Sequence, residues 1–154
     1  MILKSSQIGV SSDELSVRTL IFFIVELKSL LNYIGSIMLE SNETIAIAEG
    51  VTGGFLQFSF SQMNEASTFL IGGMNVYRAG ELIDVLKIDP VHVEKTSYVS
   101  SEIAESMALN VAKIYKSDWS ISVTGYSSPS EDSGKKLFAY FSITYRGKLI
   151  YQSD

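Results

Sequence analysis

The segment from Ala48 to Gly54 combines glycines and a hydroxyl in a pattern that suits anion binding. It reads Ala-Glu-Gly-Val-Thr-Gly-Gly, follows a short apolar stretch and precedes a predicted helix. At such a junction, backbone N–H groups and the positive end of the helix dipole converge, which favours phosphate or another anion. Gly50, Thr52, Gly53 and Gly54 are therefore candidate ligand-binding residues. A glycine pair here is equally typical of a plain tight turn, and Thr52 of a helix cap.

Tyr77 and Thr124 extend this candidate site, because each ends a predicted strand. Ligands of open α/β sheets bind beyond the carboxyl ends of the strands, so we expect both residues at the same edge as Gly50. Tyr77 has a ring for stacking and a hydroxyl for hydrogen bonding. Both residues are also compatible with ordinary packing at a strand end.

Other chemistry is poorly represented in the sequence. The chain has no cysteine, and its only histidine, His92, lies in a predicted surface turn, Asp89 to His92. No Asp/Glu/His cluster around it has the spacing of metal ligands. We therefore expect no metal site and no cofactor. Glu49 is interpreted as a buried or capping carboxylate in preference to one that faces a ligand.

The charge balance argues against nucleic acid and membrane partners. The 154 residues carry a formal net charge of −5, and the basic residues are scattered. Nucleic-acid binding depends on neutralising phosphates, which an acidic chain does not favour. The longest apolar run, Leu20 to Val25, is broken by Glu26 and Lys28, short of the roughly 20 residues of a membrane span. The polar start, Met1 to Ser12, lacks the apolar core of a signal peptide, so we expect a cytoplasmic protein.

Two helical pieces are predicted before the first strand. Ser11 and Glu14 have the spacing of a capping box, and apolar residues then recur at helical spacing as far as Leu31. A break or bend is expected near Asn32, with a second piece continuing to Leu39. We predict an N-terminal helical segment over residues 11–39.

The remainder alternates between strand and helix patterns. Strands are predicted at 44–48, 74–77 and 119–124, and a closing hairpin at 137–145 and 148–152. Helices are predicted from Phe55 onward, over 79–88, and from an N-cap at Ser100 to Tyr115. This order predicts an α/β fold with a mixed sheet and helices on both faces, in three layers. We expect one domain over residues 1–154, with its α/β core at 44–152.

An ordered set of short motifs resembles the C-terminal domain of the CinA family. That family carries Ala-Glu-Ser-x-Thr-Gly-Gly, then a helix, Gly-Gly, a strand and a tyrosine, then a Val-Ser helix start and a strand ending in Thr-Gly. The corresponding residues of this chain lie between 44 and 141: Ala48, Glu49, Thr52, Gly53, Gly54, Gly72, Gly73, Tyr77, Val99, Ser100, Thr124 and Gly125. The resemblance implies a CinA-like three-layer fold and a homo-oligomer.

The resemblance also implies an activity whose residues this chain lacks. The family deamidates nicotinamide mononucleotide, using the serine of Ala-Glu-Ser as nucleophile and a lysine in Tyr-x-Asn-x-x-Lys to activate it. Here the serine position is Gly50, the asparagine position Ala79 and the lysine position Leu82. Ser128 also stands where a glycine is expected before Pro129. We therefore predict a catalytically degenerate domain that acts as a binding or interaction module and retains a cleft for a nucleotide or another anion.

Two alternatives remain open. The chain could be an amidohydrolase of nicotinamide mononucleotide with a displaced nucleophile, either Thr52 or a serine of the loop at Ser127, Ser128 and Ser130. A lysine or carboxylate within hydrogen-bonding reach of Thr52 would favour this alternative. The chain could also be a purely structural subunit whose cleft is filled by the Val51 and Leu82 side chains.

The N-terminal helix has a predicted structural role. The family ends in a helix after its last strand, whereas this sequence stops at Asp154. We expect the extra helix over residues 11–31 to cover the sheet face that the family's C-terminal helix covers.

Overall fold

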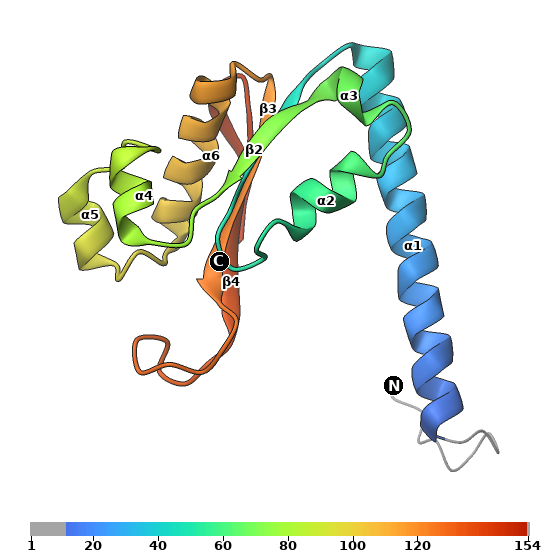
Figure 1. The fold of residues 1–154 in the computed structure, drawn as a ribbon, viewed down its shortest axis with the longest axis horizontal. Helices are drawn as coiled ribbons and strands as arrows, with labels where there is room; N and C mark the ends of the chain where they lie inside the picture. Colours follow the sequence, from blue (N-terminus) through green and yellow to red (C-terminus); the bar gives the residue numbers. More distant parts are fainter. Residues whose placement is uncertain (1–11, 154) are drawn as a thin grey trace.

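A five-stranded mixed sheet forms the centre of the protein. The computed structural model describes residues 12–153 (Figure 1). The strand order is β2-β1-β3-β4-β5, with β1 parallel to β2 and β3, and with antiparallel β3–β4 and β4–β5 pairs. The strands are β1 (Ile45–Glu49), β2 (Leu70–Asn75), β3 (Trp119–Tyr126), β4 (Phe138–Tyr145) and β5 (Lys148–Gln152).

Helices cover both faces of the sheet, as the sequence predicts. One face carries α4 (Ala79–Asp84), α5 (Pro90–Lys95) and α6 (Ser101–Tyr115); the other carries α1 (Ser12–Ser41), α2 (Phe55–Ser61) and α3 (Ala66–Phe69) (Figure 1). β1 is fully buried between them. Its alanines join the core cluster under α6, and Ile45 and Ile47 join the cluster under α1 and α2. Burial on both faces explains why this strand is continuously apolar.

The helix α6 packs against β1, β3 and β4. Ser100 caps it as predicted, because its hydroxyl accepts a hydrogen bond from the Ile103 N–H at 3.1 Å. Helical spacing of the apolar residues predicts an inward stripe of six residues. Five of them are buried, namely Ile103, Ala104, Met107, Ala108 and Val111, whereas the sixth, Ile114, is 46% exposed. The strand side contributes Ser120, whose hydroxyl donates to the Ala108 carbonyl at 2.7 Å.

The glycine pair Gly72-Gly73 lies inside β2, which corrects the prediction of a strand that begins at Met74. Both glycines are needed for close packing. A Cβ at Gly72 would lie 2.7 Å from the Tyr115 ring, and one at Gly73 would meet the Ile47 carbonyl oxygen. Because β2 must approach both α6 and β1 this closely, only glycine fits.

Other element boundaries also differ from the predictions. The predicted helix 79–88 ends earlier, at Asp84, and Lys87 adopts a positive φ of 57°. The predicted surface turn at His92 is instead the short helix α5, capped by the Asp89 carboxylate with Pro90 in its first turn. Proline favours this position because its missing N–H has no helical partner there.

A polar cluster ties together the amino ends of β1 and β3. The Glu43 carboxylate accepts hydrogen bonds from the Trp119 indole N–H and the Tyr145 hydroxyl, each at 2.6 Å. These two bonds, with a smaller contribution from Arg146, hold the pKa of Glu43 below its ordinary value. Asp118 accepts from the Thr44 N–H and hydroxyl, both at 3.1 Å, and pairs with Arg146. Several hydrogen bonds and an ion pair therefore stabilise this end of the sheet.

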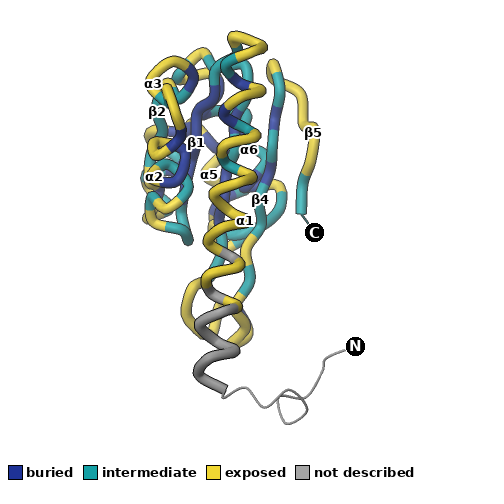
Figure 2. The backbone as a smooth tube through the Cα atoms, turned by 90° about the vertical axis from the view of Figure 1, so that its right-hand side faces the viewer, coloured by how far each residue is buried: buried dark blue, intermediate teal, exposed yellow. Residues whose placement is uncertain are grey.

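The helix α1 departs most from the predictions. It is continuous from Ser12 to Ser41, so the break expected near Asn32 is wrong, and the capping residue Ser11 lies outside the described residues. Only its C-terminal part packs on the sheet, through residues such as Leu31, Ile34 and Met38. The N-terminal end of the helix extends beyond the sheet (Figure 1), and the side chains described between Thr19 and Leu30 are exposed (Figure 2). The proposal that residues 11–31 cover the sheet is therefore wrong; the covering residues begin at Leu31.

Candidate functional site

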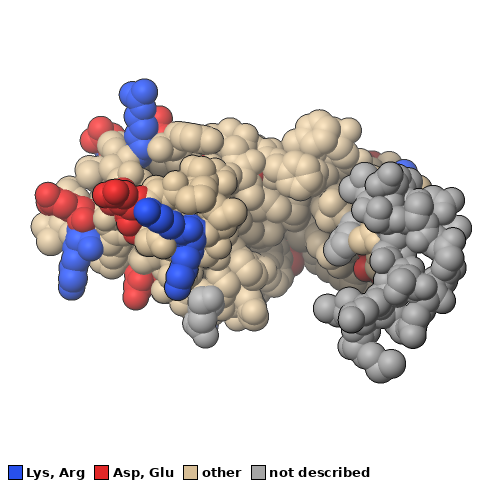
Figure 3. Space-filling model, turned by 90° about the horizontal axis from the view of Figure 1, so that it is seen from below, with Lys and Arg blue, Asp and Glu red and all other residues tan. Residues whose placement is uncertain are grey.

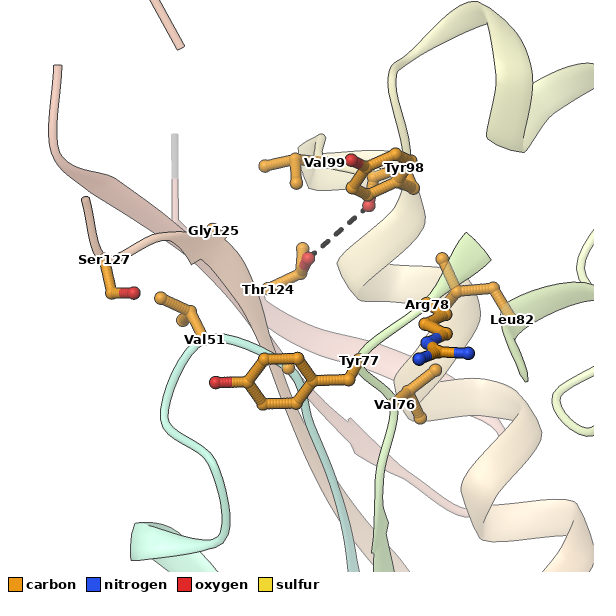
Figure 4. A pocket seen from close by; sticks show the side chains of 11 residues that line it. Val51, Val76, Tyr77, Arg78, Leu82, Tyr98, Val99, Thr124, Gly125 and Ser127 are labelled. Carbon is orange, nitrogen blue, oxygen red and sulfur yellow. Dashed lines mark hydrogen bonds between the residues drawn. The ribbon is translucent and has the colours of Figure 1, made fainter. Parts of the chain in front are cut away.

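A small pocket lies at the carboxyl edge of β1 and β3 (Figure 4). Three of the six predicted ligand-binding residues line it: Gly50 after β1, Tyr77 after β2 and Thr124 near the end of β3. The sheet brings them together because β1 is parallel to both of its neighbours. The pocket is completed by Val51, Val76, Arg78, Leu82, Tyr98, Val99, Gly125 and Ser127.

The pocket is small. Its volume is about 100 Å³, whereas ligand pockets usually measure roughly 300–1,000 Å³. Tyr77 is 71% exposed, and its ring extends across the opening on the side of Val51 (Figure 4). In this geometry the pocket accommodates a phosphate-sized group, and a larger ligand would extend over the Tyr77 ring.

Thr52, Gly53 and Gly54, the other three predicted residues, do not line this pocket. They form the turn into α2, and the Glu49 carboxylate holds this turn. Its Oε2 accepts from the Thr52 hydroxyl at 2.6 Å and from the Gly54 and Leu56 N–H groups at 3.2 and 2.9 Å. Thr52 therefore acts as a link in the turn, with its hydroxyl donated to Glu49.

Glu49 occupies the position where an anion would bind at the start of α2. It is fully buried, and its Oε1 accepts from the Gln57 N–H at 2.8 Å and from the Gln57 side-chain amide at 3.2 Å. Burial raises the pKa of Glu49, but hydrogen bonds from Thr52, Gln57 and Leu56 outweigh it, and the pKa lies below its ordinary value. This supports the interpretation of Glu49 as a buried capping carboxylate. The N–H groups at the start of α2 therefore already bind the Glu49 carboxylate.

The serine and lysine positions of the family pattern, here Gly50 and Leu82, have different structural roles. Gly50 lines the pocket, and a Cβ added there would lie 3.3 Å from the Val76 carbonyl oxygen, so a serine would require a shift of a few tenths of an ångström. Leu82 is only 4% exposed and belongs to the apolar core under α6. At the lysine position the chain thus carries a core residue.

Tyr98 forms part of the pocket wall in a strained segment. Ser97 and Tyr98 have positive φ values of 47° and 55°, a conformation that non-glycine residues rarely adopt. The contacts that join them to β3 are long: Thr124 to the Tyr98 carbonyl and Tyr126 to the Ser97 carbonyl, each 3.5 Å (Figure 4 draws the first). This wall is weakly attached to the sheet.

Arg78 is a pocket residue that the sequence analysis missed, and it supplies a positive charge. The Glu81 carboxylate accepts from the N–H groups of Tyr77 and Arg78 at 2.7 and 3.1 Å, which fixes the backbone at the start of α4. These two hydrogen bonds lower the pKa of Glu81. The signal available in the sequence was position, since Arg78 directly follows Tyr77 at a strand end.

The remaining chemical features are sparse. Within residues 12–153, no three His, Asp or Glu side chains are grouped so that they could hold a metal ion. In the same part of the chain, no helix combines the length and apolar character needed to cross a membrane. Seen from below, the charged side chains gather toward the α4–α5 side, and the middle of this face is mostly uncharged (Figure 3).

Comparisons with known proteins place the domain. Residues 27–149 match the family described as CinA C-terminal domain. A CinA-like protein of Acaryochloris marina is 33% identical over 126 residues, which cover 82% of this chain and 30% of the relative. A CinA-like protein of Synechocystis is 34% identical over 103 residues, 67% of this chain and 25% of the relative. This chain thus spans less than a third of the length of these relatives.

Solved structures agree on the fold. A competence or damage-inducible protein from Enterobacter asburiae superposes with a TM-score of 0.77 at 23% identity, covering 82% of both chains. A CinA superfamily protein from Enterobacter cloacae gives 0.77 at 24% identity, covering 82% of this chain and 76% of that one. At these identities the similarity concerns the fold alone. The family match also includes residues 27–41, so the C-terminal half of α1 belongs to the matched domain and is not an extra element.

Proposed function

This chain belongs to the CinA family, and we propose that it is a member without amidase chemistry that acts as a binding or interaction module. The observation that carries the proposal is the pair Gly50 and Leu82. Glycine has no side chain to act as a nucleophile, and leucine has no basic group. Leu82 is packed into the core, so a basic side chain from a neighbouring position could not take over the role of the missing lysine without displacing it.

The amidohydrolase alternative has one observation in its favour. The Glu49 carboxylate lies 2.6 Å from the Thr52 hydroxyl, within reach for proton transfer. Two features argue against it. Glu49 also accepts hydrogen bonds from three backbone N–H groups, and its lowered pKa makes it a weak base at neutral pH. Thr52 also lies outside the pocket lining.

Ser127 is the other candidate nucleophile in contact with the pocket. Its side chain makes no hydrogen bond with a lysine, histidine or carboxylate of residues 12–153, and it is exposed. A serine hydroxyl needs such a base to attack an amide. Ser128 and Ser130 do not line the pocket. The loop serines therefore support an amidohydrolase less well than Thr52 does.

The cleft of the module is proposed to take the phosphate of a nucleotide or another small anion. Arg78 supplies the charge, and Tyr77 and Thr124 supply hydroxyls. The structural-subunit alternative rests on the same pocket, because Val51 and Leu82 both line it and leave about 100 Å³. Binding of a small anion separates these two proposals. A homo-oligomer, as the family resemblance implies, is the proposed assembly.

The test is ammonia release from nicotinamide mononucleotide, with thermal-shift binding of the mononucleotide and of inorganic phosphate to the same protein. We expect no turnover and a rise in melting temperature that Arg78→Gln abolishes. Lys148→Gln, which removes an equal charge at an exposed position of β5 outside the pocket lining, is the matched control.

Two other outcomes would overturn the proposal, and one would strengthen it. Ammonia release that disappears in Thr52→Ala would make the chain an amidohydrolase with Thr52 as nucleophile. Turnover gained by Gly50→Ser together with Leu82→Lys would support loss of chemistry at these two positions. Absence of both turnover and binding would favour the structural subunit.

A further inference from the structure

The helix α1 carries large apolar side chains that remain exposed. Ile21, Ile24, Val25, Leu27 and Leu30 are between 42% and 61% exposed. They precede Leu31, the first residue of α1 that packs on the core under the sheet, and much of the helix surface is exposed (Figure 2). A contiguous apolar surface of this kind marks an interaction site more often than a surface that faces water.

The spacing of these residues is that of a helix–helix seam. Leu27, Leu30, Ile34 and Ile37 alternate at intervals of three and four residues, and the sequence continues the pattern upstream at Phe23 and Leu20. This is the heptad pattern of paired helices. The seam lies beside the stripe that packs on the sheet and shares only Ile34 with it. One helix thus carries two apolar faces, of which the sheet covers one.

The surface beside the seam is large enough for a specific contact. Five large apolar side chains on this side of the helix are 42–64% exposed: Ile24, Leu27, Leu30, Tyr33 and Ile37. At about 100 Å² of exposed surface each, they present on the order of 500 Å², so two copies would bury about 1,000 Å², the size at which a specific interface begins. A shallow groove of about 600 Å³ runs along Leu27, Leu30 and Tyr33.

The charge of this surface favours a second copy over a lipid surface. Residues 19–39 carry one acid, Glu26, and one base, Lys28, whereas the whole chain carries −5. Two copies of an acidic protein repel each other, and they approach most easily through an uncharged face. Helices that lie on membranes carry a lysine- and arginine-rich polar face, which this segment lacks.

We propose that α1 pairs with α1 of a second copy of this chain along the seam of Leu27, Leu30 and Ile37. Leu27, Leu30 and Ile37 lie at the start of the family-matched region, residues 27–149, and the exposed apolar side chains before residue 27 lie outside it. It names the partner of the interaction module proposed above and rests on that proposal for its oligomeric state. Turnover and ligand binding test the proposed cleft, whereas molecular mass tests the pairing of helices. Failure of one proposal can therefore be distinguished from failure of the other.

The first experiment is sedimentation velocity of the full chain across the micromolar range. We expect a dimer, and a dissociation constant raised at least about 100-fold in the double variant Leu27→Glu, Leu30→Glu. Both residues are on the surface of the single chain and glutamate favours helix, so circular dichroism should not change. The matched control is Ile150→Glu, an equally exposed residue on the edge strand β5, which should remain dimeric.

A second experiment uses the absence of cysteine from the sequence. Leu30→Cys should give a crosslinked dimer with a short bismaleimide, whereas Val91→Cys, 72% exposed on α5, should not. A wild-type chain that stays monomeric would overturn the proposal, whether residues 1–11 or another partner then cover the seam. Dissociation by Ile150→Glu but not by the Leu27/Leu30 variant would overturn it in favour of pairing through β5.

Discussion

At the amino end of β1 and β3, short hydrogen bonds join side chains from several elements, whereas at the carboxyl end the side-chain contacts between β3 and the Ser97–Tyr98 segment are long. Glu43 accepts from Trp119 and Tyr145 at 2.6 Å. Across the pocket, Thr124 and Tyr126 reach the Ser97–Tyr98 segment only at 3.5 Å. Ligand-binding regions are commonly drawn from the less stable parts of a fold. The comparison assigns rigidity to the amino-end cluster and adaptability to the pocket wall at Ser97 and Tyr98.

The largest effect should come from Glu49, whose carboxylate anchors the turn into α2 at the carboxyl end. Glu49→Ala removes the acceptor for the Thr52 hydroxyl and for the Gly54, Leu56 and Gln57 N–H groups. We expect the free energy of unfolding to fall by about 3 kcal/mol, because buried donors lose their partner. Urea denaturation measures this. A loss below about 1 kcal/mol would mean that water replaces the carboxylate and that this turn is not anchored.

A smaller loss of folding stability is expected at low pH, through carboxylates at both the amino and the carboxyl end of the sheet. The pKa values of Glu49, Glu43 and Asp118 lie below their ordinary values in the folded chain. Groups with a depressed folded pKa contribute full stability above their unfolded pKa and lose it as pH falls through the folded pKa. The melting temperature should therefore fall progressively below about pH 4.5.

The variant Tyr145→Phe separates the two ends in this titration. It removes the hydrogen bond that contributes most to the lowered pKa of Glu43, and it leaves Glu49 unchanged. We expect a shallower decline of melting temperature with acid than in the wild type. An unchanged decline would indicate that the amino-end cluster contributes little to folding stability.

The smallest effect is expected at the pocket wall. Thr124→Val keeps the shape of the side chain and removes only the 3.5 Å contact with the Tyr98 carbonyl. The free energy of unfolding should change by less than about 0.5 kcal/mol, because hydrogen bonds weaken steeply at such distances. A loss of about 1 kcal/mol or more would show that the wall is firmly held, which would remove the contrast between the ends.

Local sequence patterns predicted much of the fold. The α6 cap at Ser100, the strand beginning at Trp119 and the closing hairpin follow from spacing within one element. The Gly72-Gly73 pair was misplaced because its function is tertiary. It permits contact with Tyr115 and the Ile47 carbonyl, and neither partner is near it in sequence.

The candidate site was predicted in part for a similar reason. Gly50, Tyr77 and Thr124 meet because strand ends converge in a parallel arrangement, which the alternation of elements indicates. Arg78 and Tyr98 were missed because their place in the pocket depends on the path of the chain after β2 and before α6.

The sequence by itself determined that the nucleophile and base positions of the CinA pattern hold Gly50 and Leu82, because residue type alone decides which atoms exist for chemistry. Only the tertiary structure decided three other matters: that the Glu49 carboxylate occupies the helix start, that Leu82 lies in the core, and that α1 extends beyond the sheet. A helical pattern shows which faces are apolar, but whether a face is covered depends on residues distant in sequence that pack against it.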